Sequence, residues 1–219
     1  MATPDQHPPL SVVVLISGNG SNLQAMIDGV RAGTLPIEVR AVISNRPGVY
    51  GLERAREAGI PAIVVDHKDF PNRRVFDEAL QTHIDEFSPG LVVLAGFMRI
   101  LTPEFIRHYA GRMFNIHPSL LPEFTGLNTH QRVLDAGREE HGVSVHFVTA
   151  DLDGGPVVAR SRVEVTPTDS ADSLTRKIRL KEHRLYPAVI AMYAQGRLNA
   201  KGPVVSLDGK PLAGPIDIE

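Results

Sequence analysis

Two short polar segments carry the side chains best suited to chemistry. The first is Asn115-Ile116-His117-Pro118, and the second is Asp151-Leu152-Asp153-Gly154-Gly155-Pro156. Each follows an apolar run typical of a strand, so we expect both at the carboxyl edge of one sheet, where open α/β folds place their sites. An amide, an imidazole and a carboxylate meeting there could stabilise an oxyanion and move protons, which favours acyl transfer. Because the chain contains no cysteine, a thiol nucleophile is excluded.

The spacing within the first segment supports this chemistry. Asn115 and His117 are two residues apart and share one side of an extended chain, and Pro118 favours that extended backbone. Asp153 is the carboxylate expected to hold the His117 proton and to favour the charged donor form. Taken singly, His117 could equally be a histidine packed at a strand end, and Asp153 could be an ordinary Asp-Gly turn.

A glycine-rich turn near the N-terminus indicates an anion site. The pattern Gly18-x-Gly20-x-x-Leu23 resembles half of a dinucleotide fingerprint, but its third glycine is missing and the next strand ends in Ser44-Asn45 rather than in an acid. NAD is therefore not favoured, whereas free backbone N–H groups at a helix start still suit a phosphate. The alternative is a tight turn whose Ser or Asn only caps the helix. The expected anion contacts are Gly20, Ser21 and Asn22.

The elements that must position these residues alternate between strand and helix patterns. Continuous apolar runs typical of buried strands occupy residues 11–16, 37–43, 62–65 and 91–95, with helical patterns between them. This alternation predicts an α/β fold, a Rossmann-like open twisted sheet that is parallel in its N-terminal half, with helices on both faces. Residues 143–148 and 157–165 flank the Asp-Gly-Gly bend and predict a mixed or antiparallel C-terminal part.

No repeat or low-complexity linker divides the chain, so we expect one domain over residues 1–219. Within it we predict a disordered tail at 1–9, a parallel nucleotide-binding half at 10–100, a catalytic half at 101–198 and a C-terminal hairpin or tail at 199–219.

Composition narrows the classes of partner. A net charge of −2 does not favour nucleic acid or an anionic membrane, and no run approaches the ~20 apolar residues of a membrane span. The absence of cysteine excludes disulfides and fits a reducing compartment. The spacing of His130, His141 and His146 matches no zinc motif, so we predict no metal. We expect a cytoplasmic monomer or homodimer that acts on small molecules.

Four longer motifs resemble a known family. Residues 13–25, 94–101, 115–122 and 141–156, in this order between about residue 12 and residue 198, are similar to the phosphoribosylglycinamide formyltransferases of purine synthesis. The resemblance implies the formyltransferase fold. It also implies direct transfer of a formyl group from 10-formyltetrahydrofolate to the amine of glycinamide ribonucleotide, with no covalent enzyme intermediate and no metal.

The resemblance also implies roles for individual residues. His117 would be the proton donor and oxyanion partner, Asn115 the second oxyanion donor, and Asp153 the group that keeps His117 protonated. The implied substrate contacts are Gly20, Ser21, Asn22, Arg179 and Glu182. The implied folate contacts are Arg73, Met98, Arg99, Ile100, Leu101, Asn115, Thr149, Ala150, Asp151, Leu152 and Asp153. Without the family motifs, Met98 and Leu101 could be core, Arg73 a solvated helix start, and Arg179 with Glu182 a surface ion pair.

Two positions depart from the family pattern. Thr125 stands where the family usually has Pro, and Asn128 stands where it usually has His. Because Asn donates hydrogen bonds but does not titrate, we expect activity with a changed pH dependence.

Two other functions remain open at this stage. Related folate-dependent enzymes act on aminoacylated transfer RNA or on amino sugars, and they share the Asn-x-His…Asp core but usually carry an extra C-terminal domain. The transfer RNA enzymes also need a basic surface. A non-catalytic nucleotide-binding module is the third possibility, and the intact Asn115, His117 and Asp153 speak against it.

Overall fold

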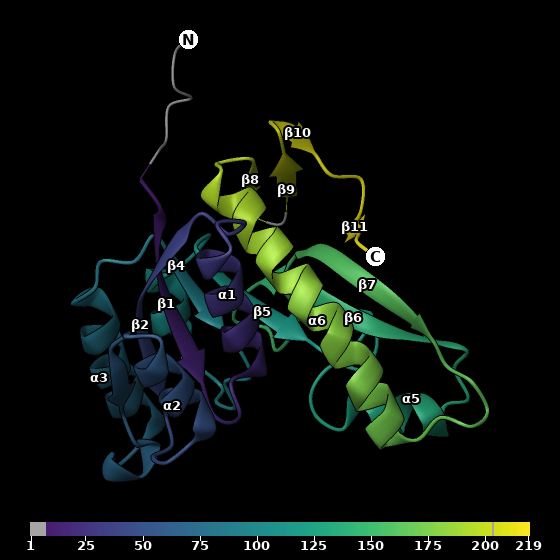
Figure 1. Cartoon of the computed structure of the whole chain (residues 1–219), viewed down its shortest axis with the longest axis horizontal. Helices are drawn as coiled ribbons and strands as arrows, with labels where there is room; N and C mark the ends of the chain where they lie inside the picture. Colours follow the sequence, from purple (N-terminus) through teal and green to yellow (C-terminus); the bar gives the residue numbers. More distant parts are fainter. Residues whose placement is uncertain (1–7, 203) are drawn as a thin grey trace.

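A computed structural model describes residues 8–202 and 204–219; residues 1–7 of the predicted tail lie outside this range. Its centre is an eight-stranded sheet of order β11-β7-β6-β5-β4-β1-β2-β3 (Figure 1). Five strands are parallel: β1 (Leu10–Ile16), β2 (Ile37–Ser44), β3 (Ala62–Val64), β4 (Leu91–Leu94) and β5 (Met113–His117). Antiparallel strands β6 (Glu140–Phe147) and β7 (Val157–Glu164) extend the sheet. The predicted fold class is confirmed.

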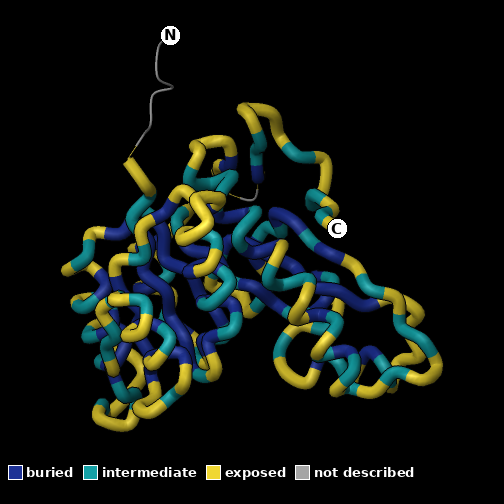
Figure 2. The backbone as a smooth tube through the Cα atoms, viewed as in Figure 1, coloured by how far each residue is buried: buried dark blue, intermediate teal, exposed yellow. Residues whose placement is uncertain are grey.

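Helices cover both faces because the central strands are apolar on both sides. In β1, Val12, Val14 and Ile16 pack in one core, Val13 and Leu15 pack in the other, and all five are 0% exposed. Figure 2 shows the strands as the buried centre of the molecule. Residues of α1 (Ser21–Arg31), α2 (Tyr50–Glu57) and α6 (Ala171–Ala194) belong to the first core. Residues of α3 (Arg73–Asp85) and α4 (Pro103–His108) belong to the second.

The smaller elements include the short helix η1 (His67–Asp69) and helix α5 (Thr129–Asp135), which precedes β6. A second sheet contains β8 (Leu198–Lys201), β9 (Val204–Leu207) and β10 (Lys210–Pro211), and the turn at Asp208-Gly209 joins the last two. No helix in the described part of the chain is long and apolar enough to cross a bilayer.

The C-terminal segment continues past the antiparallel pair of β9 and β10. Strand β11 (Ile216–Asp217) returns to the main sheet and pairs in parallel with Ala159 and Arg160 of β7. The Asp217 carboxylate accepts hydrogen bonds from Arg160 Nε at 2.8 Å and from Arg162 Nε at 3.3 Å. A strand of two residues has no periodicity to detect, so the sequence pattern could not indicate it.

The bend between β6 and β7 lies elsewhere than predicted. Because β6 runs antiparallel to β5, its end at Phe147 pairs with Phe114, and the Val148 N–H bonds to the carbonyl of Met113. The bend therefore starts beside the beginning of β5, not at its carboxyl edge, and the loop that carries Asp153 must fold back toward His117.

The bend depends on Gly155, where an added Cβ would lie 1.8 Å from the Phe147 carbonyl oxygen. We predict that Gly155→Ala lowers the free energy of unfolding by about 1–3 kcal/mol, as overpacking does, and reduces activity by displacing the Asp153 loop. Urea denaturation and a turnover assay measure the two effects. Gly214→Ala is the matched control, because a Cβ there meets nothing within 4 Å. Equal stability of the two variants would contradict the prediction.

Candidate active site

The three residues predicted to be catalytic lie together. His117 ends β5, and its Nδ1 lies 3.4 Å from Asp153 Oδ2, with the two side chains only 7% and 8% exposed. On the opposite edge of the ring, Nε2 lies 2.9 Å from the Phe124 carbonyl oxygen. Both ring nitrogens therefore face acceptors, so a doubly protonated imidazolium can donate from both.

Asp153 is held by the backbone as well as by its partners. It has φ of 51°, a left-handed conformation that Asp adopts more readily than most residues. Its Oδ2 accepts a hydrogen bond from the Gly126 N–H at 2.9 Å, and its Oδ1 lies 3.8 Å from His146 Nε2. The carboxylate thus joins the β6–β7 loop to the segment after β5 and to His117.

His146 is a site residue that the sequence analysis considered only as a possible metal ligand. It pairs with Asn115 across the β5–β6 ladder, and its Nδ1 lies 3.0 Å from the Phe147 carbonyl oxygen, to which it donates. Burial lowers the pKa of His146, so the ring is neutral and its Nε2 accepts a hydrogen bond. Asn115 Nδ2 lies 3.1 Å from that Nε2. His146 therefore orients the Asn115 amide and leaves the second N–H of Asn115 Nδ2 free. Only the strand register could have indicated this role for His146.

The predicted anion loop opens α1. Gly20 has φ of 73°, and an added Cβ would lie 2.7 Å from Gly51 Cα, so this position requires glycine. The first turn of α1 has no side-chain cap, which counts against the alternative of a turn that merely caps the helix. A cavity of about 320 Å³ collects the predicted substrate contacts, together with Met98 and His130. Those contacts are Gly20, Ser21, Asn22, Arg179 and Glu182.

Glu182 and Asn22 join the two sides of this cavity. Asn22 Nδ2 donates to Glu182 Oε2 at 2.9 Å, across the space between α1 and α6. Burial raises the pKa of Glu182, while the Asn22 hydrogen bond and the nearby charge of Arg179 act in the opposite direction. An acid in this state can accept a hydrogen bond from an amine or take up its proton.

Residues predicted to contact folate divide into exposed and buried side chains. Met98, Ile100 and Leu152 are 57%, 56% and 60% exposed, which is unusual for large apolar side chains and suits a flat ring system. The side chain of Leu101, only 6% exposed, belongs to the core that includes α3 and α4. Its predicted folate contact would have to come from its backbone.

Arg73 and Arg99, the two charged residues predicted to contact folate on this side, lie near Asp77. The Asp77 Oδ2 accepts the Thr102 N–H at 2.6 Å, and this bond fixes the segment that follows Met98. Burial raises the pKa of Asp77 although Arg73 and Arg99 lie close enough to lower it. Arg73 is exposed at the start of α3, so its guanidinium faces solvent beside this segment.

The predicted folate loop after β6 is mostly exposed. Ala150, Asp151 and Leu152 are exposed, and the buried Thr149 Oγ1 has no partner within the described ranges. Asn128, which precedes α5, has φ of 57°, is exposed and makes no side-chain capping bond. Asp153 is contacted instead by the Gly126 backbone, and the expected effect of Asn128 on the pH dependence stays a prediction.

Two further histidines, the half-buried His130 and the buried His141, form a pair beside the cavity. His130 Nδ1 lies 2.8 Å from His141 Nε2, and His141 is 1% exposed. Burial lowers the pKa of His141 to about 4, with smaller contributions from His130 and His117, and burial also lowers the pKa of His130. Within residues 8–202 and 204–219, no group of three or more His, Asp or Glu is arranged to hold a metal ion.

Comparison with known proteins gives concordant matches. A sequence model of a family described as formyl transferase matches residues 10–190. The chain is 51% identical over 203 residues to phosphoribosylglycinamide formyltransferase of Escherichia coli (strain K12), covering 93% of this chain and 96% of the relative. The solved structure of phosphoribosylglycinamide formyltransferase from Coxiella burnetii superimposes with a TM-score of 0.93 at 54% identity, covering 96% of this chain and 100% of that one. Glycinamide ribonucleotide transformylase 1 from Symbiobacterium toebii gives 0.90 at 42% identity, over 94% and 98%.

The histidine pair predicts a pH dependence of stability. Because the folded pKa of His141 is about 4, below the 6.5 of an ordinary histidine, the unfolded chain binds the proton more tightly. Stability is therefore complete above pH 6.5 and falls as the pH drops toward 4. When the pH falls from 7 to 5, the free energy of unfolding of the wild type should decrease. We expect this decrease to be about 2 kcal/mol smaller in His141→Asn, as measured by urea denaturation. The control is His83→Asn, at a histidine whose side chain is 40% exposed; equal losses in all three proteins would exclude the effect.

Proposed function

The chain belongs to the formyl transferase family, among the phosphoribosylglycinamide formyltransferases, and from this we propose that it transfers the formyl group of 10-formyltetrahydrofolate to the amine of glycinamide ribonucleotide. The products are formylglycinamide ribonucleotide and tetrahydrofolate. The predicted family, enzyme class and place in purine biosynthesis are confirmed by the comparisons.

One observation supports the assignment of the site: Ile116 and Pro118, the two chain neighbours of His117, line the anion-loop cavity, and His117 pairs with Asp153. Met98 and Ile116 line that cavity, so it reaches from the anion loop to β5 and to the proposed folate wall. A ribonucleotide whose phosphate lies on Gly20, Ser21 and Asn22 would extend its amine toward Glu182 and the catalytic residues.

The proposed reaction is a direct transfer. The amine lone pair forms a bond to the formyl carbon, the bond between that carbon and N10 of the folate breaks, and one amine proton ends on N10. As the formyl oxygen gains negative charge, it accepts two hydrogen bonds. One comes from His117 Nε2–H, which then no longer donates to the Phe124 carbonyl, and the other comes from the free N–H of Asn115. Asp153 stabilises the imidazolium during this step, and Glu182 orients the amine.

The folate co-substrate is proposed to bind against the exposed apolar side chains of Met98, Ile100 and Leu152. Arg73 and Arg99 would meet its anionic part, the Leu101 backbone its pterin, and the segment from Thr149 to Asp153 would close over the ring. The chemistry needs no metal, because both the oxyanion and the protons are handled by side chains.

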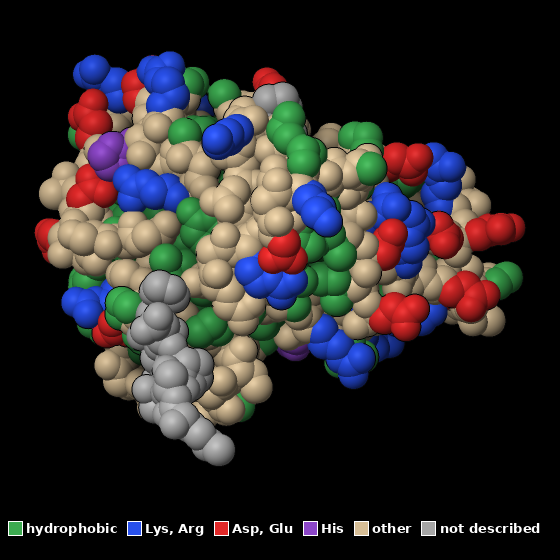
Figure 3. Space-filling model, turned by 90° about the horizontal axis from the view of Figure 1, so that it is seen from above, with side chains coloured by type: hydrophobic (Ala, Val, Ile, Leu, Met, Phe, Trp, Pro, Cys, Tyr) green, Lys and Arg blue, Asp and Glu red, His purple; other side chains and the backbone are tan. Residues whose placement is uncertain are grey.

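We further propose small molecules as the partners, in the cytoplasm, with the chain acting as a monomer or homodimer. Lys and Arg side chains are interspersed with Asp and Glu over the face seen in Figure 3, and the formal net charge is −2. Neither feature suits an enzyme that grips transfer RNA, which needs a basic surface. Amino-sugar substrates are separated from glycinamide ribonucleotide by the assay below.

The substrate is tested by following tetrahydrofolate release by absorbance. We expect kcat/KM with glycinamide ribonucleotide to be about 10⁴-fold or more above that with an amino-sugar nucleotide or a charged transfer RNA, a ratio typical of a site that hydrogen-bonds its substrate. Preferential turnover of either alternative would reject the proposed substrate. Binding of the ribonucleotide without any turnover would identify a nucleotide-binding module instead.

The catalytic roles predict losses in kcat without loss of the fold. We expect His117→Ala to lower kcat about 10²–10³-fold because it removes an oxyanion donor. We expect Asp153→Asn to lower kcat as well, because a neutral amide does not stabilise an imidazolium. The control is His83→Ala, at a half-exposed histidine outside the proposed site, and circular dichroism checks the fold of each variant. Turnover close to the wild-type value in either catalytic variant would remove that residue from the mechanism.

A further inference from the structure

Helix α2 lies directly behind the anion loop. The Gly51 N–H donates to the Gly18 carbonyl at 3.1 Å, and an added Cβ on Gly20 would lie 2.7 Å from Gly51 Cα. A Cβ on Gly51 would lie 2.5 Å from Ile16 Cδ1 and 3.0 Å from the Gly18 oxygen. In Figure 1, α1 and α2 lie near each other on the purple-to-blue side of the molecule. The loop is therefore supported by a second helix as well as by the helix it opens.

Arg54 of α2 makes the polar contacts of this support. Its Nε donates to the Asn19 carbonyl at 2.9 Å, and its Nη2 donates to Asn19 Oδ1 at 3.2 Å. Its Nη1 donates to Gln24 Oε1 on α1 at 2.9 Å. The guanidinium carbon also lies 4.5 Å from the centre of the Tyr50 ring, which packs against the planar group. One side chain thus joins the loop, α1 and its own helix.

The bond to the Asn19 carbonyl sets the direction of the next N–H. In a trans peptide the C=O and the N–H point in opposite directions, so an Asn19 oxygen turned toward Arg54 aims the Gly20 N–H away from it. That N–H bonds to no other group in the described parts of the chain. A reversed peptide would instead present an oxygen to a bound anion.

The charge of Arg54 is not neutralised locally. All its acceptors are neutral, and across residues 8–202 and 204–219 it lies within 4 Å of no carboxylate oxygen. The half-buried guanidinium therefore adds a positive potential behind the loop without lining the cavity itself.

We infer that Arg54 is a positioning residue for the phosphate of the ribonucleotide. It fixes the Asn19–Gly20 peptide in the orientation that donates to the anion, and it contributes positive potential from outside the cavity. This inference rests on the proposed function for the identity of the anion, but the geometry of the loop does not depend on which ribosyl phosphate is bound.

Steady-state kinetics of Arg54→Ala and Arg54→Lys test the inference. We expect Arg54→Ala to raise KM for glycinamide ribonucleotide about tenfold, with kcat and the KM for the folate within twofold of the wild type. Arg54→Lys should give an intermediate KM, because an ammonium keeps the charge but cannot bridge Asn19 and Gln24 together. If Arg54→Ala does not fold, Arg54→Lys decides alone. A ribonucleotide KM within twofold of the wild type in the folded variants would overturn the inference.

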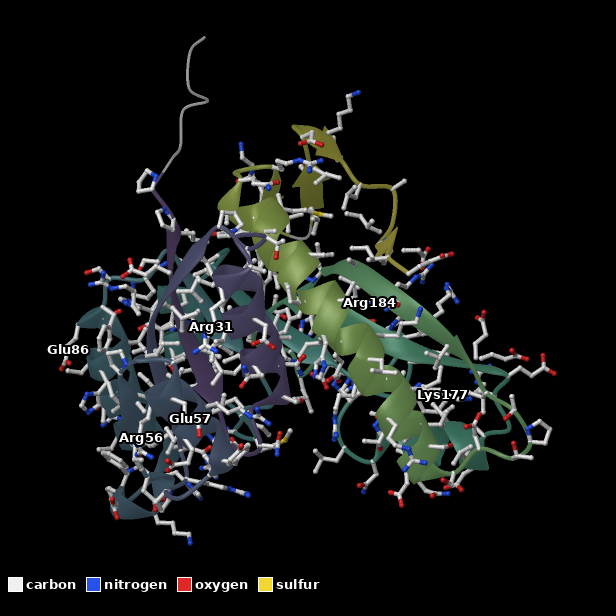
Figure 4. All side chains as sticks on the ribbon, in the orientation of Figure 1. Arg31, Arg56, Glu57, Glu86, Lys177 and Arg184 are labelled. Atoms are coloured by element: carbon white, nitrogen blue, oxygen red, sulfur yellow. The ribbon has the colours of Figure 1, made fainter. Side chains whose placement is uncertain are left out.

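The matched control is Arg56→Ala. Arg56 lies on the same helix, is labelled in Figure 4, pairs with Glu53 and is 51% exposed, so we expect no change in KM. An equal rise in KM for Arg56→Ala would mean that any loss of charge on α2 weakens binding, which would reject a specific role for Arg54.

A binding measurement separates this inference from the proposed function. We expect ribose 5-phosphate, but not ribose, to raise the melting temperature of the wild type and of Arg56→Ala, and to raise that of Arg54→Ala much less. If the wild type fails to use glycinamide ribonucleotide yet shows this pattern, the proposed substrate is wrong and the role of Arg54 stands. Equal protection of Arg54→Ala and the wild type would refute that role.

Discussion

The contact between His117 and Asp153 depends on a reversal of strand direction. Strand β5 is the last of five parallel strands along the chain, and β6 then runs back along it, so the next loop starts beside the beginning of β5. Asp153 can reach the imidazole only because that loop folds over the sheet, with Asp153 in a left-handed conformation and Gly155 pressed against the Phe147 carbonyl. The reversal also pairs Asn115 with His146, which orients the amide. One change in topology therefore assembles every group that would act on the formyl carbon.

The anion loop is assembled by different means. It follows β1 in the parallel half of the sheet, and its shape is set by two close glycine backbones and by Arg54. Helix α6 connects it to the catalytic half, since Asn22 donates to Glu182 and the Tyr186 hydroxyl lies 3.0 Å from the carbonyl oxygens of Leu94 in β4 and Phe114 in β5. Helix α6 thus links the anion loop, through Glu182, to the central strands, through Tyr186.

Much of this arrangement could be predicted from the sequence, because it depends on local patterns. The alternation of apolar runs and helices gave the parallel sheet, and the spacing of Asn115 and His117 placed both on one side of β5. Contacts that depend on register were beyond reach: the pairing of Asn115 with His146, the His130–His141 pair and the return of β11 to the sheet edge. Asp153 does contact His117 as predicted, but its loop starts beside the beginning of β5 and not at the carboxyl edge where we expected it. Leu101 was assigned to the folate wall because motif position does not distinguish a side chain in the core from a backbone at a surface.

In the absence of substrate, the His117 Nε2–H already has an acceptor, the Phe124 carbonyl. A formyl oxygen that arrives at the imidazole replaces one carbonyl with another, and such an exchange has a small net free energy. The hydrogen bond from His117 therefore stabilises the bound formyl group only slightly in the ground state, and stabilises it more once the formyl oxygen carries negative charge.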